Sequence, residues 1–212
     1  MKTAFKILTL VFLCGGALTA SVHAEAPDVD STDVVTRVID ANTLLLKSGV
    51  QVRLIGVRGP SPYDKGWNEK LAKDQGFEKA GLGAYAEEAK EFSKYLVEGK
   101  SVRIELDPDQ APFDHKDREG RLFAYIWFTA PVFPSPPAWL VIDPEVSGTQ
   151  FRHDALLNAA LVRSGLAAME TGWPFSYGGK FMSLQNEAST NSRGFWKEKM
   201  KPAVEKKAGK KT

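Results

Sequence analysis

The sequence has little cysteine and little histidine, with one cysteine and three histidines in 212 residues. Cys14 lies in the N-terminal segment, so a chain that has lost this segment has no thiol for a disulfide, a metal site or a nucleophile. Loss of this segment also removes His23 and leaves two histidines, His115 and His153. Two imidazoles are too few for a multi-histidine zinc site. Either one is compatible with a Ser-His-Asp triad, but both lie in polar, loop-like stretches, so we expect surface histidines.

The first 24 residues carry the features of a secretory signal peptide. Lys2 and Lys6 give a basic start, Leu8 to Leu13 an apolar centre, and Val22-His23-Ala24 a small-residue cleavage site. The apolar run is too short for a spanning helix, and the alternative interpretation is a retained N-terminal anchor. We therefore expect a secreted or periplasmic protein with no transmembrane span after cleavage.

Charge is unevenly distributed along the rest of the chain. From Glu25 to Trp196 there are 19 basic and 24 acidic residues, a formal net charge of −5, whereas the segment after Trp196 holds seven lysines and two glutamates. A body with this balance is not a general binder of polyanions. Contact with nucleic acid therefore requires a local site or the lysine-rich tail at 197–212, which is more often a solvated, disordered end.

Length and composition predict one globular domain with extensions. Residues 25–33 are polar and contain proline, which favours a leader, and residues 129–151 are rich in proline, which favours an insertion rather than a second domain. We therefore place the folded domain at residues 34–196.

Alternation of apolar and polar residues predicts five short strands. The second and third are joined at Ser48-Gly49, a hairpin signal, and the fifth, RLFAYIWF, is apolar enough for burial on both faces. The predicted strands are 34–39, 43–47, 50–54, 102–106 and 121–128.

Helical periodicity predicts three helices. The clearest covers 84–98 and is followed by Gly99, where a C-terminal cap belongs. The second covers 153–165, and the third includes Phe181 and ends at Gly194. Polar stretches such as 63–83 are expected to be loops. This order favours an α+β fold built on a small mixed β-barrel of the oligonucleotide/oligosaccharide-binding (OB) type.

The wording of these segments resembles the staphylococcal nuclease, or thermonuclease, family. The resemblance covers about residues 34–196 and implies a five-stranded OB-fold barrel with three helices. In the first half of the domain, VIDANTL is similar to the family's VIDGDTL, and VRLIGVRGPSP is similar to its FRL-hydrophobic-V-D-T/A-P-E. In the second half, DREGRLFAYIWF is similar to the family's DKYGR-x-LAYIY, and LNAALVRSGLA is similar to its VNEALVRQGLA.

The resemblance implies calcium-dependent endonucleolytic cleavage of DNA and RNA. The family's two arginines fall on Arg53 and Arg121, and planar guanidinium groups suit phosphate oxygens. The first acid of the calcium site falls on Asp40 and is retained. The second falls on Asn42 and the third on Arg58, so both carboxylates are replaced. One carboxylate and one amide make a poor calcium site.

Other family positions also differ. The glutamate that assists the attacking water falls on Ser61, which is not a base near neutral pH without an activating partner. The substrate-side lysine and tyrosine fall on Arg118 and Glu119. Trp173 and Tyr177 lie where the family places aromatic residues near the substrate base, so stacking on a nucleobase and packing in the core are both open.

The replaced residues leave alternatives at the metal position. Arg58 either forms a salt bridge with Asp40 that fills the vacated site, or joins Arg53 and Arg121 in a metal-free anion pocket. The salt bridge is favoured because an unpaired cluster of buried charge is costly. Asp40 itself is equally well read as a turn aspartate that caps its own backbone. Asp64 substitutes for the lost base only if the loop around it is rebuilt.

Two classes of function therefore remain. The first is a secreted nuclease in which Arg53 and Arg121 stabilise the phosphorane. The second is a non-catalytic module on the same fold that binds a nucleotide, a nucleic acid or a protein partner. The substitutions at Asn42, Arg58 and Ser61 predict that calcium-dependent cleavage is weakened or lost.

Overall fold

The computed structural model describes residues 31–76, 82–130, 137, 138, 140 and 154–200, the side chains of 198–200 excepted. The predicted signal peptide at 1–24 lies outside these residues, as do most of the leader, most of the insertion at 129–151 and the tail from 201 onward. Among the helices that the structure describes, none has both the length and the apolar character that crossing a bilayer demands.

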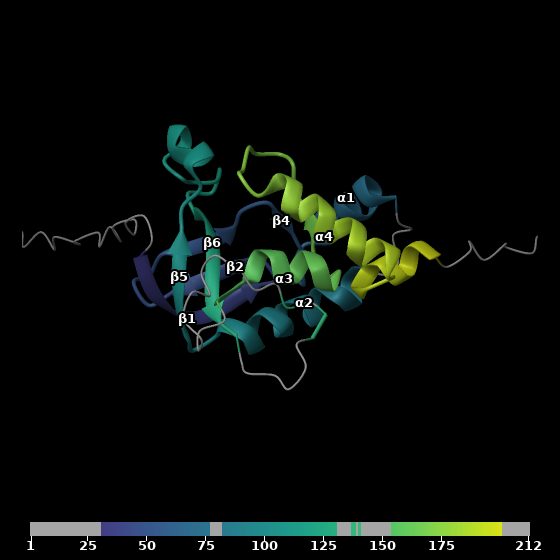
Figure 1. The fold of residues 1–212 in the computed structure, drawn as a ribbon, viewed down its shortest axis with the longest axis horizontal. Helices are drawn as coiled ribbons and strands as arrows, with labels where there is room; N and C mark the ends of the chain where they lie inside the picture. Colours follow the sequence, from purple (N-terminus) through teal and green to yellow (C-terminus); the bar gives the residue numbers. More distant parts are fainter. Residues whose placement is uncertain (1–30, 77–81, 131–136, 139, 141–153, 201–212) are drawn as a thin grey trace, which may run out of the picture.

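Five strands form a closed mixed barrel (Figure 1). They run antiparallel in the order β3-β2-β1-β5-β6, and a parallel pairing of β3 with β6 closes the barrel. The predicted α+β fold of the OB type is therefore confirmed. The strands are β1 (Ser31–Asp40), β2 (Thr43–Leu46), β3 (Gln51–Leu54), β5 (Ser101–Glu105) and β6 (Leu122–Thr129).

Helices and short strands are arranged around the barrel (Figure 1). The described residues form four α-helices, one more than predicted: α1 (Lys65–Gln75), α2 (Leu82–Val97), α3 (Leu157–Ser164) and α4 (Gly178–Thr190). Two-residue strands β4 (Val57–Arg58) and β8 (Ala168–Met169) pair with each other. Two 3₁₀ turns are η1 (Pro108–Phe113) and η2 (Gly194–Met200).

Helix α1 occupies a stretch that the sequence analysis assigned to a loop, and that prediction was wrong. Asp64 caps its N-terminus by accepting the backbone N–H of Trp67 at 2.9 Å. Gly76 ends it with a φ of 75°, a conformation that glycine adopts without steric cost. Only Leu71 and Ala72 of the helix are buried, so its apolar stripe is too narrow for periodicity to reveal.

The second predicted helix begins four residues late. Asp154–Leu156 forms strand β7, which pairs antiparallel with β6, and α3 then starts at Leu157. The helix ends at Gly165, where an added Cβ would lie 2.2 Å from the carbonyl oxygen of Arg193. Only glycine therefore allows the chain after α4 to pack this closely against the end of α3.

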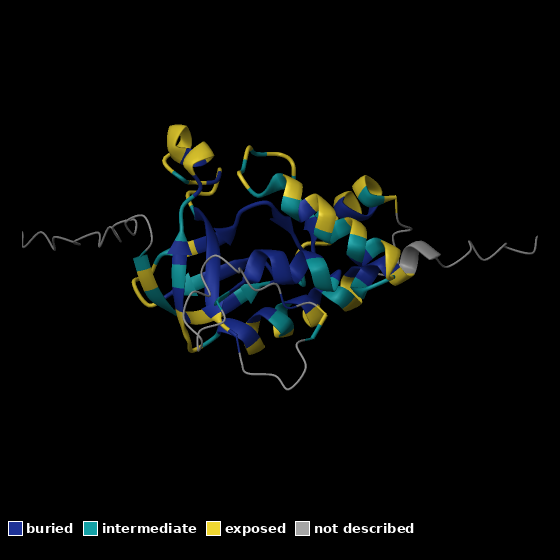
Figure 2. Ribbon diagram, viewed as in Figure 1, coloured by how far each residue is buried: buried dark blue, intermediate teal, exposed yellow. Residues whose placement is uncertain are grey.

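The core lies between the barrel and the helices packed on it, with buried residues from α2, α3 and α4 (Figure 2). Every residue from Leu122 to Phe128 is buried, which confirms the burial predicted for this strand. Asn158 on α3 is also buried, and its amide donates to the carbonyls of Ile55 at 3.0 Å and Ala124 at 3.3 Å. Its oxygen accepts the N–H of Ile126 at 3.1 Å. This satisfied amide joins α3 to β6 and to the end of β3.

Candidate functional site

One cavity of about 180 Å³ is lined by seven residues that the sequence analysis named, five of them at the family's metal, arginine and base positions. Asp40 ends β1, Asn42 lies in the turn before β2, Arg53 lies in β3, and Ser61 follows β4. Arg121 joins them because β6 runs parallel to β3, with Leu122 opposite Val52. We call this the arginine cavity; Thr43, Asp64, Trp67 and Glu119 complete its lining.

Arg53 is held in place by an acid that the sequence analysis did not foresee. Its Nη2 donates to Oε2 of Glu170 at 2.7 Å, a contact between residues 117 apart in the sequence. The guanidinium carbon lies 5.2 Å from the ring centroid of Trp67 and 5.9 Å from that of Phe123. Its Nε is buried without a hydrogen-bond partner among the described residues. The cation is therefore oriented, but its donors are not all used.

Arg121 is bonded to two acids in the loop before β6. Its Nε donates to Oδ2 of Asp117 at 2.6 Å, and its Nη2 donates to Oε2 of Glu119 at 2.6 Å. Asp117 also accepts the backbone N–H groups of Glu119 and Arg121. Burial alone would raise the pKa of Asp117, but the bonds from Arg121 outweigh it and lower the pKa. Asp117 therefore stays ionised and fixes Arg121.

Arg58 has neither of the arrangements considered from the sequence. Its Nη1 donates to Oδ2 of Asp74 on α1 at 2.5 Å, so the expected salt bridge with Asp40 is wrong. It also does not line the arginine cavity. Asp40 instead accepts the backbone N–H of Asn42 at 3.0 Å, as a turn aspartate does. The physical reason is α1, which brings an acid to Arg58 that the loop prediction omitted.

Trp67 is a site residue that the sequence analysis missed. Its ring centroid lies 4.6 Å from the guanidinium carbon of Arg58 and 5.2 Å from that of Arg53. Its indole N–H donates to the carbonyl of Gly59 at 2.8 Å. The indole thus contacts both cations and the loop between β4 and α1. The sequence offered one signal for this residue, a single tryptophan in the polar stretch between Asp64 and Gly76.

Ser61 builds the turn that leads into α1. Its hydroxyl oxygen accepts the backbone N–H groups of Tyr63 and Asp64, each at 3.2 Å. Its own backbone N–H and carbonyl are both bonded to the side-chain amide of Asn68, at 2.7 and 2.8 Å. Both lone pairs of the hydroxyl therefore have a structural use. The turn also carries Asp64 to the wall of the arginine cavity.

A second cavity, of about 260 Å³, adjoins the first and contains two more predicted residues. The guanidinium carbon of Arg118 lies 5.8 Å from the ring centroid of Trp173. Trp173 makes an edge contact with Phe123, with 5.3 Å between ring centroids. We call this the tryptophan cavity; its lining residues are Arg53, Trp67, Lys70, Asp117, Arg118, Glu119, Phe123, Glu170, Gly172 and Trp173.

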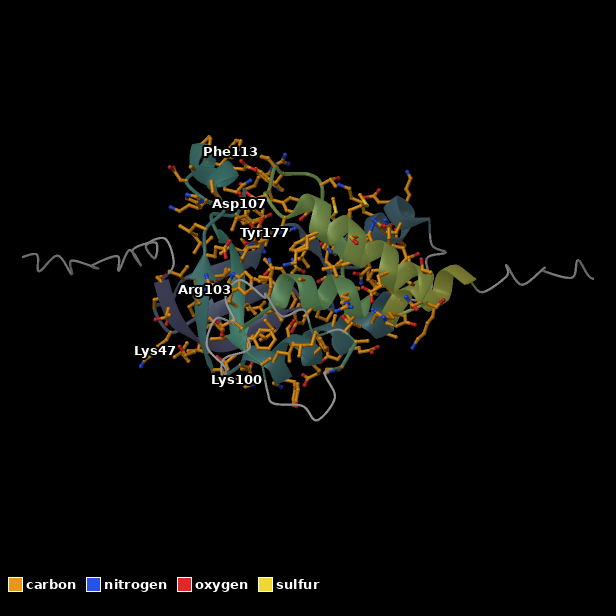
Figure 3. The ribbon with its side chains drawn as sticks, in the orientation of Figure 1. Lys47, Lys100, Arg103, Asp107, Phe113 and Tyr177 are labelled. Atoms are coloured by element: carbon orange, nitrogen blue, oxygen red, sulfur yellow. The ribbon has the colours of Figure 1, made fainter. Side chains whose placement is uncertain are left out.

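Tyr177, predicted near the substrate base, lines neither cavity. Its hydroxyl donates to Oε1 of Glu105 at 2.8 Å, and its ring lies 4.5 Å from that of Tyr125. The cause is Asp107, a buried acid nearby (Figure 3), which accepts the backbone N–H of Ser176 at 2.7 Å and the hydroxyl of Tyr125. These bonds hold the loop before α4 against the barrel.

The Asp107 and Tyr125 pair has opposite pKa shifts. Burial would raise the pKa of Asp107, but hydrogen bonds from Tyr125, Ser176 and the backbone of Asp109 outweigh burial and lower it. Burial and the carboxylate of Asp107 both raise the pKa of Tyr125. The pair is therefore a carboxylate and a neutral phenol at neutral pH.

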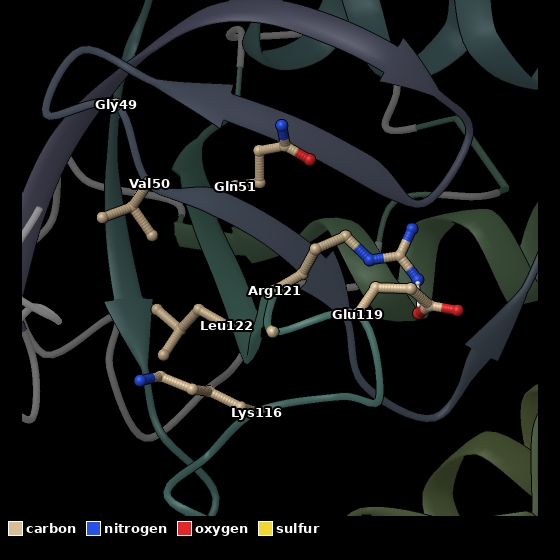
Figure 4. A pocket seen from close by; sticks show the side chains of 8 residues that line it. Gly49, Val50, Gln51, Lys116, Glu119, Arg121 and Leu122 are labelled. Carbon is tan, nitrogen blue, oxygen red and sulfur yellow. Dashed lines mark hydrogen bonds and ion pairs between the residues drawn. The ribbon is translucent and has the colours of Figure 1, made fainter. Parts of the chain in front are cut away.

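A third cavity, of about 330 Å³, lies between the β2–β3 hairpin and the loop before β6 (Figure 4). Val50 and Leu122 give it apolar walls, and Lys116 lies below the hairpin in this view. It shares Glu119 and Arg121 with the arginine cavity. We call it the hairpin cavity; Gly49, Gln51 and Gly120 complete its lining.

The donors around the arginine cavity do not match those that Ca²⁺ prefers. Calcium takes six to eight oxygen ligands, several of them carboxylate. Asp40 already accepts one backbone N–H through Oδ1, Asp64 caps α1, and Glu119 is bonded to Arg121. Within the described ranges no group of three or more histidine, cysteine or acidic side chains is placed to hold a metal ion.

Comparison with known proteins agrees with the barrel fold. A sequence model of the family described as "Staphylococcal nuclease homologue" matches residues 51–198. The thermonuclease of Staphylococcus hyicus is 31% identical over 107 residues, which are 49% of this chain and 53% of that protein. The match thus spans about half the length of that relative. Because the family match covers most of the chain, the chain belongs to the staphylococcal nuclease homologue family.

Proposed function

We propose that this domain binds a phosphodiester of single-stranded nucleic acid, or a nucleotide, at the arginine cavity, and that its calcium-dependent hydrolysis is weak or lost. Two guanidinium groups lining one cavity suit the oxygens of a phosphate group. Arg53 lines the cavity beside Trp67, and Arg121 is held at the cavity by Asp117. These features support phosphate binding.

The observation that carries the proposal is the ion pair between Arg58 and Asp74. At the position where the family resemblance places a metal-binding acid, the chain has a cation whose partner lies on α1. A guanidinium group supplies no oxygen ligand for a divalent metal ion. Removal of a general base costs about 10²- to 10⁴-fold in rate, and Ser61 uses its hydroxyl within a turn. Hydrolysis is therefore expected to suffer more than binding does.

The tryptophan cavity supports a nucleic-acid ligand rather than an isolated phosphate. It begins at Arg53 and reaches Trp173 and Arg118. Stacking of a base on an aromatic ring contributes roughly 1–3 kcal/mol and tolerates any base sequence. A phosphate bound between the arginines thus has an aromatic wall within reach of the neighbouring base. We also propose that the chain is exported, because its first 24 residues carry the pattern of a signal peptide.

Binding of a fluorescently labelled single-stranded oligonucleotide, measured by polarisation in chelator, tests the proposal. We expect Arg121→Ala to weaken binding by at least about tenfold, because a charge-assisted contact contributes roughly 1.5–3 kcal/mol. Lys94→Ala is the matched control, because Lys94 is a cation on α2 that lines none of the three cavities. Equal affinities of the two variants would rule out the arginine cavity as the binding site.

A further inference from the structure

We propose that Glu119 determines the ligand affinity of this site by competing with the ligand phosphate for Arg121. The inference rests on the proposed phosphodiester site and adds a residue that lowers the affinity of this site for the ligand phosphate. Glu119 is the carboxylate that Arg121 contacts on its exposed side, and it occupies the place that an incoming phosphate needs.

The position of Glu119 supports this role. It is the one residue that lines the arginine, tryptophan and hairpin cavities alike. Figure 4 shows its carboxylate turned toward the guanidinium of Arg121, with the contact drawn as a dashed line. Oε2 of Glu119 lies 2.6 Å from Nη2 of Arg121. A ligand that crosses from one cavity to another therefore passes this carboxylate.

Asp117 contacts the same guanidinium but has a different role. Its side chain is 3% exposed, and it accepts two backbone N–H groups besides the Nε of Arg121. The side chain of Glu119 is 65% exposed, and its carboxylate pairs with Nη2 of Arg121. Asp117 is thus a fixed positioning residue, whereas Glu119 is free to rotate away from the cation.

The ion pair between Glu119 and Arg121 is weak enough for a ligand to displace it. Exposed ion pairs contribute little to stability, because water screens them and ordering the side chains costs entropy. A displaced Glu119 still lies beside the bound phosphate, and two negative charges at this separation repel each other. The carboxylate therefore lowers anion affinity twice, first by competition and then by repulsion.

Glu119→Gln tests the inference, because it removes the charge and keeps the shape and the hydrogen-bonding oxygen. In the polarisation assay with the labelled oligonucleotide and chelator, we expect about tenfold tighter binding. Glu91→Gln is the matched control. Glu91 is an exposed acid on α2 that pairs with Lys94 and lines none of the three cavities, so it reports the effect of net charge alone.

We expect Asp117→Asn to change oligonucleotide affinity in the opposite direction from Glu119→Gln. Because Asp117 orients Arg121, its loss should weaken binding, while thermal unfolding of each variant shows whether the domain is still folded.

Equal affinity of Glu119→Gln and Glu91→Gln would contradict the inference. If Arg121→Ala weakens binding but Glu119→Gln gives no gain, the inference fails and the proposed function stands. If Arg121→Ala has no effect on affinity, either alone or combined with Glu119→Gln, then both the inference and the proposed function fail. They also fail if neither the unsubstituted protein nor Glu119→Gln binds the oligonucleotide.

Discussion

Arg58 and Asp74 form an ion pair at 2.5 Å that joins β4 to α1. Trp67 covers the same guanidinium, so a single helix supplies both the counter-ion and the aromatic contact. A cation in place of a metal-binding acid would otherwise be left buried and unpaired, which is costly. Helix α1 is therefore the structural compensation for the arginine, and it also forms a wall of the arginine cavity.

Removal of Asp74 should destabilise the protein more than removal of the pair. Asp74→Ala leaves Arg58 buried without its partner, and because the carboxylate is 43% exposed we expect a loss of roughly 1–2 kcal/mol in unfolding free energy. In Arg58→Met/Asp74→Ala the unpaired cation is absent, so the double variant should recover most of the loss. Urea unfolding of the two single variants and the double variant measures this coupling. Additive effects would show that the pair contributes nothing.

Restoring the family's acids should restore calcium binding. The variant Asn42→Asp/Arg58→Asp/Ser61→Glu also needs Asp74→Asn, because Asp74 would otherwise repel the new acid at position 58. With calcium at about 100 times its Kd, ligand linkage predicts a rise in Tm of roughly 5–10 °C. Differential scanning calorimetry measures the shift. The unsubstituted protein should shift by less than about 1 °C under the same conditions, and a larger shift would show that the native donors suffice.

The contribution of Asp107 to stability should depend on pH. Its pKa in the folded protein lies below the ordinary value of an aspartate, so its bonds stabilise the folded state fully above the unfolded pKa. The contribution is lost as the pH falls through the lower folded pKa. We expect Asp107→Asn to cost roughly 1–3 kcal/mol at pH 7 and much less below about pH 3. Urea unfolding at several pH values measures it, and a cost independent of pH would contradict the account.

Trp67 should matter for both stability and binding. Trp67→Leu removes the aromatic contact to Arg53 and Arg58, and each cation–π contact contributes roughly 0.5–2 kcal/mol. Trp67→Phe keeps an aromatic face but loses the bond to the carbonyl of Gly59. We therefore expect oligonucleotide affinity to fall in the leucine variant and to be largely retained in the phenylalanine variant. Polarisation measurements that give equal affinities would show that the aromatic contact does not orient Arg53.

Local pattern predicted the strands, and the family resemblance implied that they close into a five-stranded barrel. The strands either alternate apolar and polar residues or, as in β6, are uniformly apolar, and a hairpin glycine separates β2 from β3. Hydrophobic periodicity in the sequence therefore indicates which residues of these strands are buried. Helix α1 was missed because only two of its residues are buried. Its signal lay in its ends, Asp64 and Gly76, rather than in its periodicity. The start of α3 was misplaced because pairing of β7 with β6 overrides helical preference.

The candidate site was predictable only where residues occupy the barrel itself. Asp40, Asn42, Arg53 and Arg121 meet at one cavity because strand pairing in the barrel brings them together. Ser61 reaches the same cavity from the loop after β4, outside the barrel. The partners of the arginines were not predictable. The bond between Arg53 and Glu170 joins residues 117 positions apart, and no local pattern carries such a contact.

The central claim is that the cavity retains phosphodiester binding without efficient calcium-dependent hydrolysis. The most direct test incubates the purified protein with labelled single-stranded DNA, in calcium and in chelator, and follows both cleavage and binding. We predict equal binding in the two conditions and little or no increase in cleavage when calcium replaces chelator. Efficient calcium-dependent cleavage that Arg121→Ala abolishes would contradict the account.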